Sequence, residues 1–69
     1  MTNSRLLREW IEKKGYKLKS VAATLGITPY ALQKKIENES EFKASEIAAF
    51  VNDLGMSVKD RDYIFFGQM

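Results

Sequence analysis

Several side chains with hydrogen-bonding capacity lie between Thr28 and Asn38, in the segment TPYALQKKIEN. Gln33 carries an amide that both donates and accepts, Lys34 a charged donor, and Tyr30 a hydroxyl on an aromatic ring. A helical wheel with Leu32 and Ile36 on the buried side places Lys34 opposite them, with Tyr30 nearby and Gln33 at the flank. Such groups on an exposed helix face can recognise a partner molecule.

Two residue types that active sites and metal sites commonly use are absent from the sequence. The chain has no histidine and no cysteine, which removes the commonest general base, the commonest metal ligands and any disulfide. No convergent pair of acids is evident either. We therefore expect no enzyme, no metal site and no cofactor.

Charge is unevenly distributed along the chain, although the net charge is only +2. Residues 1–36 hold eight basic and two acidic side chains, a net charge of +6, whereas residues 37–69 hold three basic and seven acidic ones, a net charge of −4. An asymmetric field of this kind suits a protein that binds an anionic partner on one face.

Apolar residues recur at intervals of three and four, which predicts a single all-α domain over residues 1–69. The five expected helices cover 5–14, 18–25, 29 to 37 or 38, 44–54 and 58–66. Ser4, Thr28 and Ser57 stand where N-caps are expected, and Gly15, Gly26 and Gly55 where helices should end. No segment alternates at a period of two, so we expect no sheet.

Only three residues, Gly26, Ile27 and Thr28, separate the second and third predicted helices, which is the layout of a helix-turn-helix. Ala22 is small enough to let the two helices approach, and Leu32 holds the third helix against the second. The order LKSVAATLGITPYALQKKI resembles the motif of small phage repressors of the Cro and lambda-repressor type. EFKASEI and a final IFF are similar to small regulators from phages and prophages of Gram-positive bacteria. The resemblance implies a compact, five-helix lambda-repressor-like fold with its motif over about 18–37.

In proteins of this family the start and outer face of the third helix read bases in the major groove, which implies this role for Pro29, Tyr30, Gln33 and Lys34. Gln33 can form a bidentate pair with adenine, Lys34 can donate to guanine, and Tyr30 can contact a thymine methyl group or a phosphate. The expected phosphate contacts are Lys17, Lys19, Thr28, Lys35, Asn38 and Lys43.

Three features depart from the family pattern. Lys35 stands where many relatives have an apolar residue, and Ile36 takes the buried role one position later. Lys17 and Leu18 stand where relatives often have glutamine or threonine, so a glutamine-mediated phosphate contact does not carry over. The acids at 37, 39 and 41 are expected to face away from DNA, although Glu37 can alternatively accept from a cytosine amino group.

Two functions fit these observations. The first is a sequence-specific repressor of the Cro kind on double-stranded DNA, dimerising through its fifth helix and C-terminal tail. The second is an antirepressor that binds a partner repressor protein. It is favoured by the acidic second half and by Phe65, Phe66 and Met69, which either form an exposed apolar patch or complete the core.

The expected location is the cytoplasm, with no membrane partner. The apolar runs are too short to span a bilayer, and MTNSRLLREW has no hydrophobic segment of a signal peptide.

Overall fold

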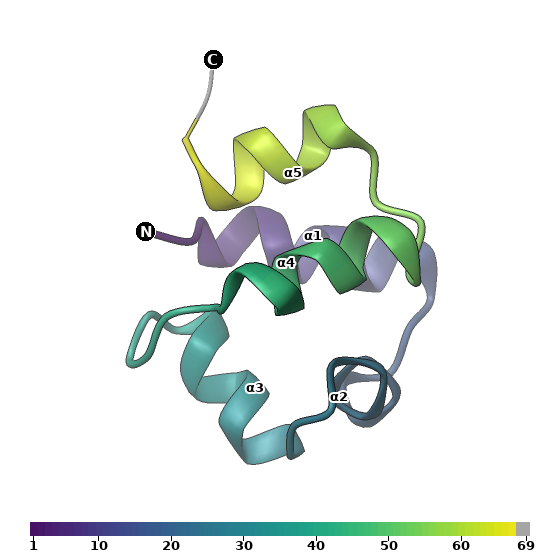
Figure 1. The fold of residues 1–69 in the computed structure, drawn as a ribbon, viewed down its shortest axis with the longest axis vertical. Helices are drawn as coiled ribbons and strands as arrows, with labels where there is room; N and C mark the ends of the chain where they lie inside the picture. Colours follow the sequence, from purple (N-terminus) through teal and green to yellow (C-terminus); the bar gives the residue numbers. More distant parts are fainter. Residues whose placement is uncertain (68–69) are drawn as a thin grey trace.

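Five helices follow one another with short connections in the computed structural model, which describes residues 1–67 (Figure 1). Their bounds are α1 Ser4–Lys14, α2 Leu18–Leu25, α3 Pro29–Ile36, α4 Ala44–Asn52 and α5 Val58–Phe65. No strand occurs among these residues, so the predicted all-α class is confirmed. Helix α5 lies at one end of a body of 30 × 24 × 21 Å, α2 and α3 lie at the other end, and α1 and α4 lie between them.

The turn between α2 and α3 depends on a glycine in a left-handed conformation. Gly26 has a φ of 76°, and its N–H donates to the carbonyl of Ala23 at 3.1 Å, while the N–H of Ile27 donates to Ala22 at 3.0 Å. This Schellman arrangement satisfies the last carbonyls of α2. Thr28 Oγ1 then accepts from the N–H of Ala31 at 3.0 Å, so α3 begins at once with Pro29 in its first position.

The same arrangement ends α3, with an asparagine in place of the glycine. Asn38 has a φ of 64°, and the N–H of Glu39 donates to the carbonyl of Lys34 at 2.8 Å. Asparagine tolerates this conformation better than most residues, which explains why α3 ends at Ile36 rather than at residue 37 or 38. Helices α4 and α5 also end slightly earlier than expected, at Asn52 and Phe65.

The first residues of the chain are fastened to two helices. Asn3, not Ser4, is the N-cap of α1, because its Oδ1 accepts from the N–H of Leu6 at 3.0 Å. The prediction that Ser4 fills this role was therefore wrong. The Ser4 hydroxyl instead donates to the carbonyl of Ile36 at the end of α3, and the N–H of Asn3 donates to the carbonyl of Ile64 in α5 at 2.7 Å.

Phe50 of α4 is fully buried at the centre of the core. Its ring centroid lies 5.9 Å from that of Trp10, 5.8 Å from that of Phe42 and 5.4 Å from that of Phe65. Such aromatic contacts add specific geometry to the burial of a large apolar area. The core also includes the fully buried Val21, Ala22, Leu32 and Ile36, so α2 and α3 are seated on the same core as the other helices.

Candidate nucleic-acid interface

The outer face of α3 carries the four residues for which base reading was expected. Pro29 and Gln33 are exposed, and Tyr30 retains 72% of its accessible surface. The Lys34 ammonium lies 5.4 Å from the centroid of the Tyr30 ring, a cation–π contact that holds the two side chains together. Because Leu32 and Ile36 anchor the opposite side of the helix, this face points to solvent. The structure therefore groups the four residues on one surface of α3, on which Pro29, Tyr30 and Gln33 are exposed and Lys34 is half-buried.

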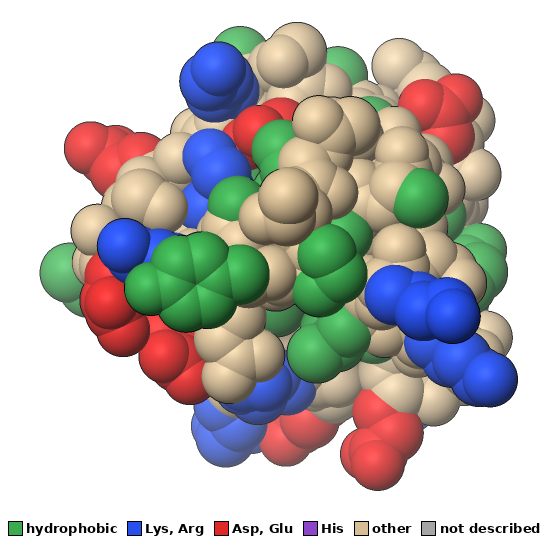
Figure 2. All heavy atoms as spheres, turned by 90° about the horizontal axis from the view of Figure 1, so that it is seen from below, with side chains coloured by type: hydrophobic (Ala, Val, Ile, Leu, Met, Phe, Trp, Pro, Cys, Tyr) green, Lys and Arg blue, Asp and Glu red, His purple; other side chains and the backbone are tan. Residues whose placement is uncertain are grey.

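Figure 2 looks at the end of the molecule formed by α2 and α3. Uncharged side chains occupy the middle of this face, and lysine and arginine side chains lie around its edges, with some acidic side chains between them. A surface with hydrogen-bonding and apolar groups at its centre and cations at its rim suits a ligand that is charged on its outside and uncharged in its grooves.

Four of the expected phosphate contacts are exposed at helix starts or in the turn. Lys17 is the N-cap residue of α2, Lys19 lies in the first turn of that helix, and Lys43 is the N-cap residue of α4. Thr28 accepts a hydrogen bond through its hydroxyl oxygen, which leaves the hydroxyl proton available as a donor. These residues keep the surface position that a phosphate contact requires.

Lys35 does not keep such a position, which corrects its interpretation as a phosphate contact. Its ammonium lies 3.1 Å from Glu46 Oε1 and donates to the carbonyl of Glu41 at 3.0 Å, and only 11% of its side chain is exposed. Glu46 Oε1 also accepts from the N–H of Lys43 at 2.8 Å, as a capping group of α4. Lys35 therefore joins α3 to α4.

The side-chain amide of Asn38 is hydrogen-bonded within the protein, which corrects its prediction as a phosphate contact. Its Oδ1 accepts from the N–H of Thr2 at 3.0 Å, and its Nδ2 donates to the Thr2 carbonyl at 2.8 Å and to Ser4 Oγ at 3.3 Å. The amide thus pairs with the main chain of Thr2 in both directions, and Thr2 is buried. This pairing fixes the N-terminal residues to the end of α3.

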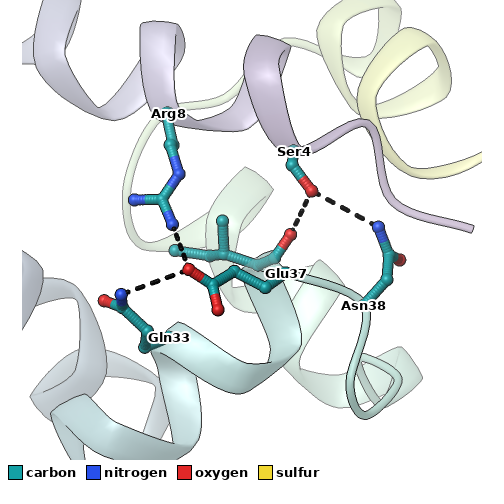
Figure 3. Close-up of polar contacts among 6 residues, drawn as sticks. Ser4, Arg8, Gln33, Glu37 and Asn38 are labelled. Atoms are coloured by element: carbon teal, nitrogen blue, oxygen red, sulfur yellow. Dashed lines mark hydrogen bonds and ion pairs between the residues drawn. The ribbon is translucent and has the colours of Figure 1, made fainter.

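The acid at the end of α3 is held inside the protein's own polar network (Figure 3). Glu37 Oε2 accepts from Arg8 Nη2 of α1 at 3.1 Å and from Gln33 Nε2 at 3.3 Å. The sequence contained no local signal for the contact between Arg8 and Glu37, because the two residues are 29 positions apart. Arg8 is thus a residue of this surface that sequence reasoning missed.

The structure assigns Phe65 and Phe66 to different sides of the alternative left open by the sequence, an exposed apolar patch or completion of the core. Phe65 is buried in the core, whereas Phe66 keeps 54% of its surface, with the Arg61 guanidinium 5.8 Å from its ring centroid. Val58 and Tyr63 of α5 are also exposed. Met69 lies outside the described residues.

None of the protein-family models, curated proteins and solved structures compared with this chain matches it. Among the described residues, no helix is both long enough and apolar enough to cross a bilayer.

Proposed function

We propose that this chain is a sequence-specific DNA-binding transcriptional regulator with a lambda-repressor-like fold, of the Cro type found in phages and prophages. Helix α3 enters the major groove, and the side chains of Pro29, Tyr30, Gln33 and Lys34 face the base edges. Lys17, Lys19, Thr28 and Lys43 contact the phosphates on either side.

The observation that carries this proposal is the junction of α2 and α3. The two helices are separated by three residues, Thr28 caps the second of them, and its outer face carries hydrogen-bonding side chains above a buried anchor. A reading helix must be held rigidly while its outer side chains stay free of the core, and the burial of Leu32 and Ile36 meets the first requirement.

A single module of this size buries only roughly 600–1,000 Å² against DNA, which limits affinity. Two copies on a palindromic site compensate, with half-sites about 10 base pairs apart. We propose α5 as the dimer surface, because Val58, Tyr63 and Phe66 are large apolar residues at that end of the chain with 40–54% of their surface exposed.

The test is fluorescence anisotropy with labelled double-stranded DNA over about 50–200 mM salt. A pool of duplexes with a randomised window of about 20 base pairs, wide enough for two half-sites, is first selected for binding to the protein. The labelled probes are the randomised pool and the sequence that this selection enriches. Each neutralised phosphate contributes about −0.9 to the slope of log affinity against log salt, so three lysines give a slope of about −3 per monomer. A slope near zero, with no enriched sequence, contradicts the proposal.

The exposed apolar residues of α5 favour a second candidate, an antirepressor that binds a partner repressor protein. The C-terminal half carries a net charge of −4, which opposes DNA and suits a basic protein surface. Co-purification with a repressor in the absence of DNA supports this candidate, and loss of that complex on Phe66→Ala assigns it to α5.

A further inference from the structure

The carboxylate of Glu37 stands between a residue of α1 and the candidate reading residue Gln33 (Figure 3). One oxygen, Oε2, accepts from both Arg8 at 3.1 Å and Gln33 at 3.3 Å. The arginine and the acid remain 43% and 41% exposed, so the chain of contacts lies at the surface that α3 presents. Through Glu37, the orientation of the Gln33 amide on α3 is connected to the positive charge of Arg8 on α1.

A glutamine amide has a donor end and an acceptor end, and rotation about its last torsion exchanges them. A carboxylate only accepts, so Glu37 can face only the amino end of Gln33. With one N–H directed at Glu37, the carbonyl oxygen and the second N–H remain free. An adenine edge in the major groove offers one donor and one acceptor, which match that remaining pair.

The positive charge of Arg8 has a second effect on Glu37. An isolated carboxylate beside the reading face repels phosphates, and a negative charge at the C-terminal end of a helix is unfavourable with respect to the helix dipole. The Arg8 guanidinium offsets both effects because it forms an ion pair with the same oxygen that faces Gln33.

We propose that Glu37, held by Arg8, is a positioning residue that sets the orientation of the Gln33 amide and thereby makes this position select adenine. The inference rests on the proposed DNA-binding function. It assigns specificity to an acid that makes no base contact of its own.

The experiment measures base preference and overall affinity separately. Wild type and variants bind the selected duplex and the single-base-pair replacements of each position, and the Gln33 contact is the position whose preference disappears in Gln33→Ala. Glu37→Ala removes the carboxylate, and Glu39→Ala is the matched control, because it removes an equal charge from an exposed acid in the same segment. Circular dichroism melting confirms that each variant is folded. Glu37→Gln replaces Glu37→Ala if the latter unfolds, since a second amide restores the ambiguity of orientation.

Wild type is expected to prefer adenine at the Gln33 contact by about 5-fold to 100-fold, and Glu37→Ala to reduce that preference by at least about three-fold. Affinity for non-cognate duplexes should stay equal or rise, and Glu39→Ala should leave the preference unchanged. In the Gln33→Ala background, Glu37→Ala should have no further effect on this base pair, because the two residues act through one contact.

Equal preference in Glu37→Ala and Glu39→Ala overturns the inference while leaving the proposed function intact. An effect of Glu37→Ala that persists without Gln33 overturns it as well, because the acid then acts by charge alone. If the wild-type protein enriches no sequence and binds DNA without salt dependence, the proposed function fails and this inference fails with it.

Discussion

Lys35 and Glu46 form a buried ion pair, with 3.1 Å between the ammonium and carboxylate and with 11% and 6% of the two side chains exposed. The same carboxylate caps α4 through the N–H of Lys43. The pair therefore fixes the position of α3, and with it the candidate reading face, relative to α4. Removing one partner leaves the other charge in a poorly solvated site.

Lys35→Met should destabilise the protein by about 3–5 kcal/mol, the usual cost of leaving a buried charge unpaired. The free energy of unfolding of a 69-residue chain is itself only about 3–10 kcal/mol, so the variant should lose a large part of its stability. Urea denaturation followed by circular dichroism measures the loss. Lys13→Met is the control, because Lys13 is exposed and its substitution should change stability by no more than about 0.5 kcal/mol. Adding Glu46→Gln to Lys35→Met should restore part of the loss, and a double variant less stable than Lys35→Met contradicts the argument.

Asn38 combines a left-handed backbone with a side chain that binds Thr2, and two substitutions separate these roles. Asn38→Gly keeps the backbone conformation and loses only the contacts to the N-terminal residues, whereas Asn38→Ala loses both. We expect Asn38→Ala to be the less stable variant by about 1 kcal/mol, and both variants to lose amide-exchange protection at Thr2. Thermal melting and hydrogen exchange check the two expectations. Unchanged protection at Thr2 in both variants is incompatible with the fastening role of Asn38.

Gly26→Ala should cost about 1–2 kcal/mol, because an alanine is strained at a φ of 76°. A Cβ atom at this position meets no other atom within 4 Å, so the cost is conformational and not steric. Gly26→Asn should cost less, since asparagine adopts left-handed backbone more readily. The denaturant midpoint should be higher for Gly26→Asn than for Gly26→Ala. A higher midpoint for Gly26→Ala contradicts the prediction.

Lys17→Ala and Lys19→Ala should each reduce the salt slope of DNA binding by about 0.9 and weaken binding to all sequences alike. Lys59→Ala is the control, because this exposed lysine of α5 belongs to the opposite end of the molecule from α2 and α3 (Figure 1). Anisotropy titrations over a salt series measure the slopes. If Lys59→Ala reduces the salt slope as much as Lys17→Ala and Lys19→Ala do, DNA does not bind at the end of the molecule formed by α2 and α3.

The order and approximate bounds of the helices could be predicted because their signals are local. Gly26 must follow a helix whose apolar residues stop at Leu25, and Thr28 and Ser57 stand one position before helices that they cap. The start of α1 was predicted wrongly, because Ser4 was expected to be the cap although Asn3 is an equally capable one. The contact between Asn3 and Ile64 contributes to the choice, and it joins residues at opposite ends of the chain.

The candidate site could be predicted only where one helix determines it. Leu32 and Ile36 define the buried side of α3, so the exposure of Tyr30 and Gln33 followed from periodicity. Lys35 lies at the flank of that helix, where burial depends on whether a neighbouring helix covers it. Helix α4 does so with Glu46, and no pattern within α3 contains that information.

The contacts of Thr2 and Asn3 have a consequence for the order in which structure can form. Asn3 donates to Ile64, and Thr2 pairs with Asn38, so both contacts join residues that are far apart in the sequence. The α2–turn–α3 unit can form from contacts between neighbouring residues, whereas the contacts of Thr2 and Asn3 require the closure of long loops, which costs more conformational entropy. We therefore expect the α2–turn–α3 unit to form early in folding and the contacts of Thr2 and Asn3 to form late.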